Sequence, residues 1–273
     1  MDYQKLPLFI HDYPQEAVIN PDHEHLDYKL PEKLIYAFVT KENIDKFLAK
    51  YSYRIVGSME TISFNPNVYE IDYEGQKIGL CQAPLGAPAA TQLLDWLIGY
   101  GVRKVLTVGS CGALEDFEEN EFVIPTKAIR DEGTSLHYLP ASESIELTSK
   151  FVKQVEQILQ DFNYRIHEVT TWTTDGFYRE TVELVNHYRK LGVATVEMEC
   201  AALAACAQFR NVDFAQILFT ADSLKDVDNY DERDFGINSK RRNNVSSENH
   251  SLHDQQDQTG QNQTHRYQVQ WCK

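Results

Sequence analysis

The chain has 273 residues, which is enough for one large domain or two small ones. Its 41 acidic and 26 basic residues give a formal net charge of −15, and this balance argues against binding of nucleic acid or an anionic membrane through bulk charge. No stretch approaches the ~18 consecutive apolar residues of a transmembrane helix, and the N-terminus lacks the basic and apolar regions of a secretory signal. We therefore expect a cytoplasmic protein without a nucleic-acid or membrane partner. The net charge does not exclude a small anionic substrate.

The cysteines predict reduced thiols and no metal site. There are five, an odd number, and four of them lie in apolar or Gly/Ala-rich surroundings, as in a cytosolic protein. No pair has the spacing of zinc ligands with histidines nearby, so we expect no metal.

Composition and hydrophobic periodicity divide the chain into three parts. Residues 1–33 are polar and contain four prolines, which predicts an irregular N-terminal arm. Residues 34–236 carry regular hydrophobic periodicity and predict the folded domain. Residues 237–273 are rich in glutamine and asparagine and have neither helical nor strand periodicity, which predicts a disordered polar tail. That tail is either natural or the result of a reading-frame change, and the sequence leaves both open.

Strands and helices alternate along the central part. A short apolar run predicts a strand over 34–39, and a helix follows over 41–50 with Thr40 as a candidate N-cap. Glu74 and Gly75 predict a hairpin turn between strands over 68–73 and 76–83. Further helices are expected over 89–100, 145–159, 179–190 and 198–209, and further strands over 104–108, 121–129, 165–171, 193–196 and 214–219. This alternation predicts an α/β fold with a largely parallel sheet.

A glycine-rich motif, Gly109–Ala113, directly follows the predicted strand over 104–108. Ligands of α/β sheets bind at the carboxyl ends of strands, and glycines there let backbone N–H groups approach an anion. Turns of this kind are structural about as often as functional, so Ser110 becomes a candidate only if other polar groups converge on it.

Carboxylates follow two other predicted strands. Glu197 and Glu199 come after the strand over 193–196, where they need solvent, partners or ligand hydroxyls. The alternative for this pair is a helix N-terminus, which favours acidic residues. Asp222 follows the strand over 214–219 and would serve as a general acid if apolar surroundings raised its pKa. The alternative for Asp222 is an N-cap or turn aspartate.

The segment Thr171–Glu180 contains three aromatic residues. Trp172 has the flat face that stacking on a nucleobase requires, and Phe177 and Tyr178 have the same capacity. Packing in the core is the commoner fate of aromatic side chains.

Taken together, these segments resemble the nucleoside phosphorylase family, which includes purine nucleoside and uridine phosphorylases and their nucleosidase relatives. The resemblance runs from about Leu34 to about Ser223 and rests on five motifs in family order. They are Leu85–Ala90, Thr107–Leu114, Thr173–Glu180, Val196–Leu203 and Thr220–Ser223. The segment Arg130–Pro140 also resembles a branch related to uridine phosphorylase. The resemblance implies a three-layer α/β/α domain with a central mixed, largely parallel sheet.

The resemblance also implies roles around the sugar and the phosphate. Glu199 would bind the ribose 2′ and 3′ hydroxyls, and Met198 would pack against the sugar. Ser110 would donate a hydrogen bond to phosphate. Inorganic phosphate would be a co-substrate, with no bound cofactor.

Three further residues are implied around the base. Glu197 would lie near it, Trp172 would occupy the position of the stacking aromatic, and Asp222 matches the acid that protonates N7 in purine-specific members. Arg179 is present in the region where uridine-specific relatives recognise uracil, but the accompanying glutamine is absent. These residues slightly favour purine nucleosides over uridine as the expected substrate. A homo-oligomer, a dimer or a hexamer, is expected because family sites are completed by a neighbouring subunit.

The chain departs from the family at the phosphate. Asn43, Thr107 and Phe64 stand where the family has arginines, and each charge-assisted hydrogen bond to phosphate is worth roughly 1.5–3 kcal/mol. Five basic residues are candidate replacements: Lys41, Arg54, Arg103, Arg130 and Arg179.

Three functions therefore stay open. A nucleoside phosphorylase would cleave the N-glycosidic bond with phosphate, giving base and pentose 1-phosphate. A nucleosidase would use water, and an inactive relative would only bind nucleosides or serve as an oligomer scaffold. The phosphorylase, a pentosyltransferase, is the expected activity.

Overall fold

Short polar side chains and a proline begin four of the helices. The structure is a computed structural model that describes residues 6–9 and 13–233. The hydroxyls of Thr40, Ser149 and Thr181 each accept a hydrogen bond from the backbone N–H three residues on, which begins α1 (Lys41–Leu48), α3 (Lys150–Asp161) and α4 (Val182–Lys190). Helix α2 (Ala87–Gly99) has a proline in its first turn, where no backbone N–H is needed. Helix α5 (Cys200–Phe209) follows Glu199 directly.

The strands form one mixed sheet with the order β10-β6-β8-β9-β5-β1-β4-β3-β2, and β7 pairs with β6. The strands are β1 (Lys33–Ala37), β2 (Tyr53–Ser58), β3 (Asn67–Tyr73), β4 (Gln76–Gln82), β5 (Lys104–Ala113), β6 (Phe122–Asp131), β7 (Ser144–Glu146), β8 (Ile166–Thr174), β9 (Val193–Glu197) and β10 (Asp213–Ser223). Short 3-10 turns, η2 (Pro7–Phe9), η3 (Thr134–His137) and η4 (Phe177–Arg179), complete the described elements.

Five of these strands close into a ring. Strand β10 pairs with both β5 and β6, and β8 and β9 connect β6 back to β5. The pairings β5–β10, β6–β8 and β8–β9 are parallel, whereas β5–β9 and β6–β10 are antiparallel. The expected α/β class and mixed sheet are confirmed, and the ring brings the ends of β5, β9 and β10 together.

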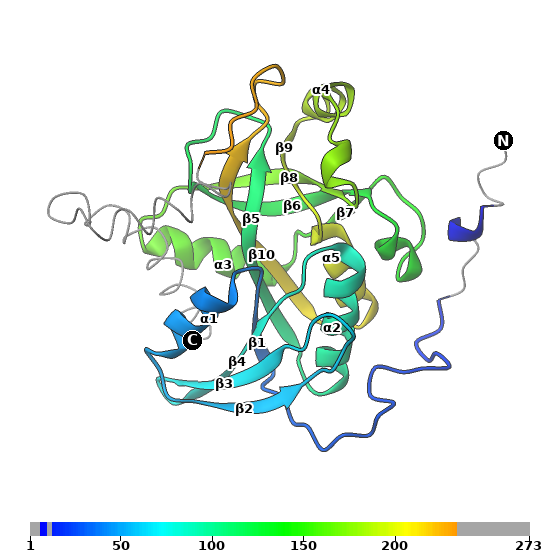
Figure 1. Ribbon diagram of the computed structural model, residues 1–273, viewed down its shortest axis with the longest axis vertical. Coiled ribbons are helices and arrows are strands. Elements are labelled where there is room, and N and C mark those ends of the chain that lie inside the picture. Colours follow the sequence, from blue (N-terminus) through cyan, green and yellow to red (C-terminus); the bar gives the residue numbers. More distant parts are fainter. Residues whose placement is uncertain (1–5, 10–12, 234–273) are drawn as a thin grey trace, which may run out of the picture.

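Helices cover both sides of this sheet. In Figure 1, α2 and α5 lie together on one side of β5 and β10, and α1 and α3 lie on the other. Helix α5 is built almost entirely of small or apolar residues, all but its last two buried, which lets it pack closely against α2 and the sheet. Helix α4, which precedes β9 in the chain, lies at the top of the view in Figure 1.

Three strands are longer than the sequence predicts. Strands β5, β8 and β10 continue through the motifs that we expected to follow them. Pairing between strands supplies hydrogen-bond partners to the backbone of those motifs, which overrides the turn preference of glycine, serine and aspartate.

Two segments predicted as helices begin with a different element. The segment predicted as a helix over 145–159 contributes first to β7 and then to α3, which begins after Ser149. The segment predicted over 179–190 contributes to η4 and then to α4, which begins after Thr181. In both segments, the hydroxyl of the N-cap residue sets the start of the helix. Strand β2 was not predicted from the sequence.

The N-terminal arm lies against α2 and the end of α5. Leu30 is buried in the main core, and the Tyr28 ring makes edge-on contacts with Trp96 and Tyr100. Gln15 donates its side-chain amide to the carbonyl of Phe209. The predicted tail, 237–273, lies outside the described residues.

None of the helices among the described residues is long and apolar enough to cross a membrane. Four cysteines, Cys81, Cys111, Cys200 and Cys206, are buried as free thiols.

Gly75→Ala should destabilise the fold by about 1 kcal/mol. Gly75 has a φ of 80° in the β3–β4 turn, and a Cβ there would meet nothing within 4 Å, so backbone strain is the whole cost. Urea unfolding measures the change. Gly133→Ala is the matched control, because Gly133 has a φ of −90° and its Cβ would meet its nearest atom at 3.9 Å. Equal effects of the two substitutions would contradict the explanation.

Candidate functional site

The ends of three strands meet at Gly112. A Cβ at this position would lie 2.9 Å from Leu224 Cδ1, 3.0 Å from Val196 Cγ1 and 3.4 Å from Asp222 Oδ1. Glycine is therefore required by the close approach of β9 and β10 to β5. Asp222 and the residues after β9 are held at one edge of the ring by this packing.

Glu197 caps helix α5. Its Oε2 accepts hydrogen bonds from the backbone N–H groups of Glu199 at 2.8 Å and Cys200 at 2.6 Å, and its Oε1 accepts from Thr173 Oγ1 at 2.6 Å. Thr173 Oγ1 in turn accepts from the backbone N–H of Ala201. Both carboxylate oxygens of Glu197 are thus engaged, so the geometry does not support the base-binding role predicted for it. The alternative that we considered, a carboxylate at a helix N-terminus, describes what the structure shows.

Glu199 directly precedes α5, and its side chain reaches the start of α2. The residue is only 6% exposed. Its Oε1 accepts a hydrogen bond of 2.6 Å from the backbone N–H of Gly86. Burial, and then the neighbouring Glu197, raise the pKa of Glu199, and burial likewise raises that of Glu197. Asp175 adds further negative charge. Met198, between the two glutamates, is partly buried, and its predicted sugar contact stays a prediction.

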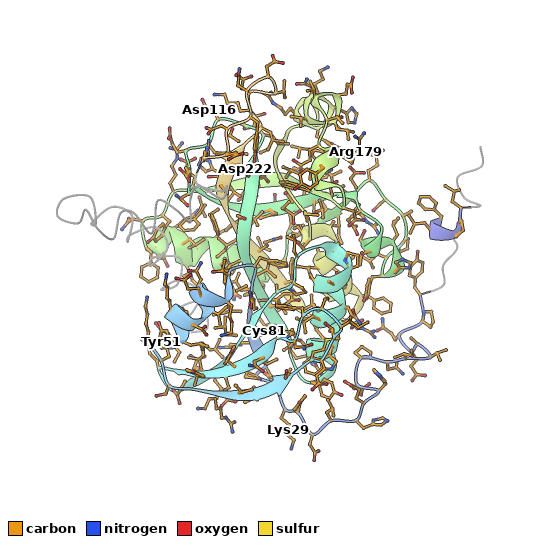
Figure 2. All side chains as sticks on the ribbon, viewed as in Figure 1. Lys29, Tyr51, Cys81, Asp116, Arg179 and Asp222 are labelled. Atoms are coloured by element: carbon orange, nitrogen blue, oxygen red, sulfur yellow. The ribbon has the colours of Figure 1, made fainter. Side chains whose placement is uncertain are left out.

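Asp222 borders a cavity of about 290 Å³, near the lower end of the size range of small-molecule sites. The side chain is 5% exposed, and burial raises its pKa. Its Oδ2 accepts a hydrogen bond of 2.9 Å from the hydroxyl of Tyr230. Phe177, Tyr178 and Glu180 also line this cavity. In Figure 2, Asp222 lies towards the same end of the molecule as Arg179, away from Tyr51 and Cys81.

Trp172 is a core residue with no exposed surface. Its ring lies 4.5 Å from that of Tyr188, and its Nε1 donates to Asp131 Oδ2 at 2.9 Å. A base cannot stack on a ring that is covered on all sides, so the geometry does not support the stacking role predicted for Trp172. The exposed aromatics that line the cavity with Asp222 are Phe177, Tyr178 and Tyr230, which are 40%, 92% and 51% exposed.

The sequence reasoning missed Glu180 and Tyr230. Glu180 ends the motif Thr173–Glu180, but the motif assigned it no role. Tyr230 reaches Asp222 because the chain turns back after β10, where Ser223 and Asp231 exchange two backbone hydrogen bonds. No local sequence pattern predicts that turn.

Ser110 belongs to the middle of β5 and not to a loop. Gly109, Ser110 and Cys111 pair in register with β10, and Gly112 pairs with β9. The motif is therefore part of the sheet and is not the turn that we expected. The Ser110 side chain is partly exposed, and its predicted hydrogen bond to phosphate stays a prediction.

The neighbourhood of Ser110 lacks the expected arginines. Thr107 is fully buried and donates to the carbonyl of Ala215, and Asn43 lies in the first turn of α1. Phe38 follows β1, and its Cβ would lie 3.0 Å from a Cβ on Gly109, so an apolar side chain stands beside β5 there.

Four of the five candidate replacement cations have other partners. Lys41 pairs with Asp45 and Arg54 with Glu70, while Arg103 donates to two backbone carbonyls and Arg130 to two carbonyls and two serine hydroxyls. Arg179 is exposed in η4. Within residues 6–9 and 13–233, no cluster of His, Cys, Asp or Glu is arranged to hold a metal ion.

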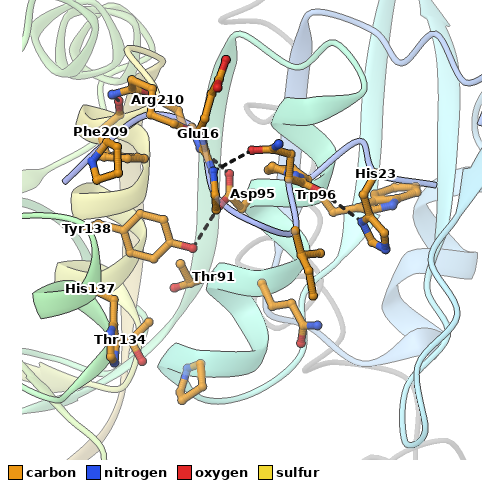
Figure 3. A pocket seen from close by; sticks show the side chains of 18 of the residues that line it. Glu16, His23, Thr91, Asp95, Trp96, Thr134, His137, Tyr138, Phe209 and Arg210 are labelled. Carbon is orange, nitrogen blue, oxygen red and sulfur yellow. Dashed lines mark hydrogen bonds and ion pairs between the residues drawn. The ribbon is translucent and has the colours of Figure 1, made fainter. Parts of the chain in front are cut away.

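A larger cavity, of about 820 Å³, lies between the N-terminal arm, α2 and the end of α5. None of the six predicted site residues lines it. Figure 3 shows Arg210 and Tyr138 directed at Asp95, with which they form hydrogen bonds of 2.7 to 3.1 Å. Because these polar groups bind one another, they are not available to a ligand there.

Comparison with known families matches residues 43–250 to the Phosphorylase superfamily. The chain belongs to this superfamily. The match continues past Gly236, the predicted end of the domain, into the predicted tail.

Similar proteins in the superfamily include two nucleoside phosphorylases. Guanosine phosphorylase of Halorubrum lacusprofundi is 30% identical over 146 residues, covering 52% of this chain and 59% of the relative. A DeoD-type purine nucleoside phosphorylase of Caldanaerobacter subterraneus subsp. tengcongensis is 29% identical over 160 residues, covering 56% of this chain and 67% of the relative. The chain thus matches about three fifths to two thirds of the length of these relatives.

Solved structures of the superfamily share the fold. Uridine phosphorylase of Vibrio fischeri superposes with a TM-score of 0.70 at 19% identity, covering 93% of this chain and 94% of the other. Purine nucleoside phosphorylase of Toxoplasma gondii, in complex with immucillin-H, also gives a TM-score of 0.70, at 15% identity and with 89% and 91% covered. The three-layer architecture expected from the resemblance is thereby confirmed.

Glu199→Gln should make the stability of the protein less dependent on pH. The folded-state pKa values of Glu197 and Glu199 are raised above the ordinary value of 4.5, so the folded state holds more protons than the unfolded state above that pH. The free energy of unfolding should therefore fall as pH rises from about 5 towards 8. Glutamine cannot ionise but keeps an oxygen for the N–H of Gly86. Urea unfolding across this range measures the slope, with the exposed Glu183→Gln as control; an unchanged slope in Glu199→Gln would contradict the explanation.

Proposed function

We propose that the protein is a nucleoside phosphorylase that cleaves the N-glycosidic bond of a purine nucleoside, releasing the base and a pentose 1-phosphate. One observation carries the proposal: the buried carboxyl of Asp222 borders a base-sized cavity beside exposed aromatic side chains. Membership of the superfamily and the two phosphorylase relatives support it.

In the proposed reaction, different residues would bind the sugar, contact the base and supply the proton. Breaking the bond gives the sugar oxocarbenium character, and the buried Glu199 carboxyl would hold the ribose hydroxyls and stabilise that positive charge. Phe177 would contact the face of the base. Asp222 would hand a proton to N7 as the base departs, and the upward shift of its pKa by burial favours that role. Tyr230 occupies Oδ2, which leaves Oδ1 to carry that proton.

The nucleophile separates two candidate functions. Phosphate as nucleophile matches the relatives, and Ser110 would donate a hydrogen bond to it. Water as the nucleophile is favoured by a different observation. Phe38 lies beside β5, the strand that carries Ser110, and four of the five candidate cations have other partners. A nucleosidase is therefore the second candidate.

We also propose a homo-oligomer, a dimer or a hexamer. A neighbouring copy would be the source of positive charge that a single chain does not direct at Ser110. Sedimentation of the full chain at micromolar concentration tests this, and a monomer would contradict it.

The protein should release base from inosine, guanosine or adenosine, and release should require phosphate. Phosphate is the nucleophile in the proposed reaction, so without it the glycosidic bond should persist. Chromatography of the free base with and without phosphate measures this. Equal release without phosphate would identify a nucleosidase, and binding without release would identify an inactive relative.

Asp222→Asn should lower kcat for purine nucleosides about 10²- to 10⁴-fold, the usual span for a general acid. Asparagine keeps an oxygen for the Tyr230 hydroxyl but cannot hand over a proton. Steady-state kinetics measure the change, and nucleoside binding through Glu199 should survive. Asp228→Asn, an exposed substitution in the same turn, should leave kcat unchanged. The purine assignment fails if Asp222→Asn retains full activity or if the wild type prefers uridine.

A further inference from the structure

Helix α5 is capped from a distant strand and not by the residue that precedes it. Of the described helices, α1, α3 and α4 each follow a serine or threonine whose hydroxyl accepts a backbone N–H of the same helix. The residue at that position of α5 is Glu199, and its side chain makes no such hydrogen bond with α5. The first N–H groups of a helix need acceptors, so other residues supply them here.

Glu197 and Thr173 supply those acceptors. Glu197 Oε2 accepts from the N–H groups of Glu199 and Cys200. Thr173 Oγ1 accepts from the N–H of Ala201 at 3.0 Å and donates to Glu197 Oε1 at 2.6 Å, so its donor and acceptor roles are both used. Thr173 has no exposed surface, and it lies on β8, 28 residues before Ala201.

This arrangement leaves the Glu199 carboxyl directed away from its own helix. Its Oε1 accepts from the N–H of Gly86 at the start of α2. The N–H of Ala201 is one of the groups that the side chain of an N-cap residue normally binds. Without Thr173 that N–H would be a buried donor lacking its partner, and the carboxyl of Glu199 could turn back to bind it.

We propose that Thr173 is a positioning residue for ribose recognition: it caps α5 in place of Glu199 and so keeps the Glu199 carboxyl available to the sugar hydroxyls. The inference rests on the proposed function, which assigns those hydroxyls to Glu199. Because Thr173 is fully buried, it acts through Glu199 and does not touch the substrate.

The same hydroxyl also stabilises Glu197. Burial raises the pKa of Glu197, and the hydrogen bond from Thr173 acts in the opposite direction by favouring the ionised form. Loss of the hydroxyl would thus leave two buried groups, Glu197 Oε1 and the N–H of Ala201, without their partner. Each unpaired buried group costs free energy, which favours a rearrangement at the start of α5.

Thr173→Val tests the inference, because valine has nearly the shape of threonine but no hydroxyl. The probe is 9-deazainosine, whose carbon–carbon glycosidic bond cannot be cleaved, so binding is measured apart from catalysis. Isothermal titration calorimetry on the full chain should show about 10- to 100-fold weaker binding by Thr173→Val, the range of hydrogen bonds to a charged group. Thr173→Ser keeps the hydroxyl and should bind the probe within about threefold of the wild type.

Thr171→Val is the matched control. Thr171 lies two residues earlier on the same strand, has no exposed surface either, and donates its hydroxyl to the carbonyl of Thr195 at 3.4 Å. This variant should keep the wild-type affinity for the probe. Urea unfolding of both valine variants measures their stability, which separates an effect on binding from the general cost of losing a buried hydroxyl.

A second background tests whether Thr173 acts through Glu199. Glu199→Ala removes the carboxyl that Thr173 is proposed to keep available, so adding Thr173→Val to it should change the affinity by less than about twofold. An equal loss of affinity in both backgrounds would show that Thr173 acts through packing, and would overturn the inference. Should Thr173→Val not fold, Thr173→Ala replaces it in both backgrounds.

The outcomes separate this inference from the proposed function. Unchanged binding by Thr173→Val, an equal loss in Thr171→Val, or no binding of the probe by the wild type would overturn the role of Thr173, whatever the catalytic assay gives. The expected binding pattern without cleavage of any nucleoside would support Thr173 and refute the phosphorylase. Cleavage of inosine with equal probe binding by Thr173→Val and the wild type would support the phosphorylase and overturn the role of Thr173.

Discussion

The carboxylate of Glu197 organises the candidate site. It lies at the end of β9 and accepts hydrogen bonds from two backbone N–H groups at the start of α5 and from Thr173 of β8. Burying this carboxylate is costly, and the three donors and the positive end of the helix offset the cost. The same bonds fix the backbone of Glu199, so the neighbouring carboxyl is directed at the start of α2. Glu197 is thus structural, and the carboxyl of Glu199 reaches the backbone N–H of Gly86.

This division shows how far a motif can be interpreted from spacing alone. The sequence places two glutamates two residues apart, and in the structure they point differently: Glu197 faces α5 and Glu199 faces Gly86. Which of the two is available to a ligand depends on Thr173, a residue 24 positions earlier that no local pattern connects to them. The same limit applies to Trp172, whose burial is set by Tyr188 and Asp131.

Most of the fold could be predicted because its signals are local. Thr40, Ser149 and Thr181 carry the hydroxyls that begin helices, and the Glu74-Gly75 turn carries the positive φ angles of a hairpin. The lengths of β5 and β10 could not be predicted, because their last residues include glycine, serine and aspartate, which favour turns when considered alone. Pairing in a closed ring provides those residues with partners, and that ring is a property of the whole chain.

The charges of the site bear on the order of events in the proposed reaction. Carboxyl groups dominate it: in the proposed reaction Glu199 and Asp175 would lie on the side of the sugar, and Asp222 and Glu180 on the side of the base. Such surroundings stabilise a sugar that becomes positive as the bond to the base breaks, whereas they repel a phosphate dianion. The architecture of a single chain therefore favours departure of the base more than entry of the nucleophile. A phosphorylase built on this chain needs positive charge near the phosphate, and a nucleosidase does not. The source of that charge is therefore the physical question that separates the two activities.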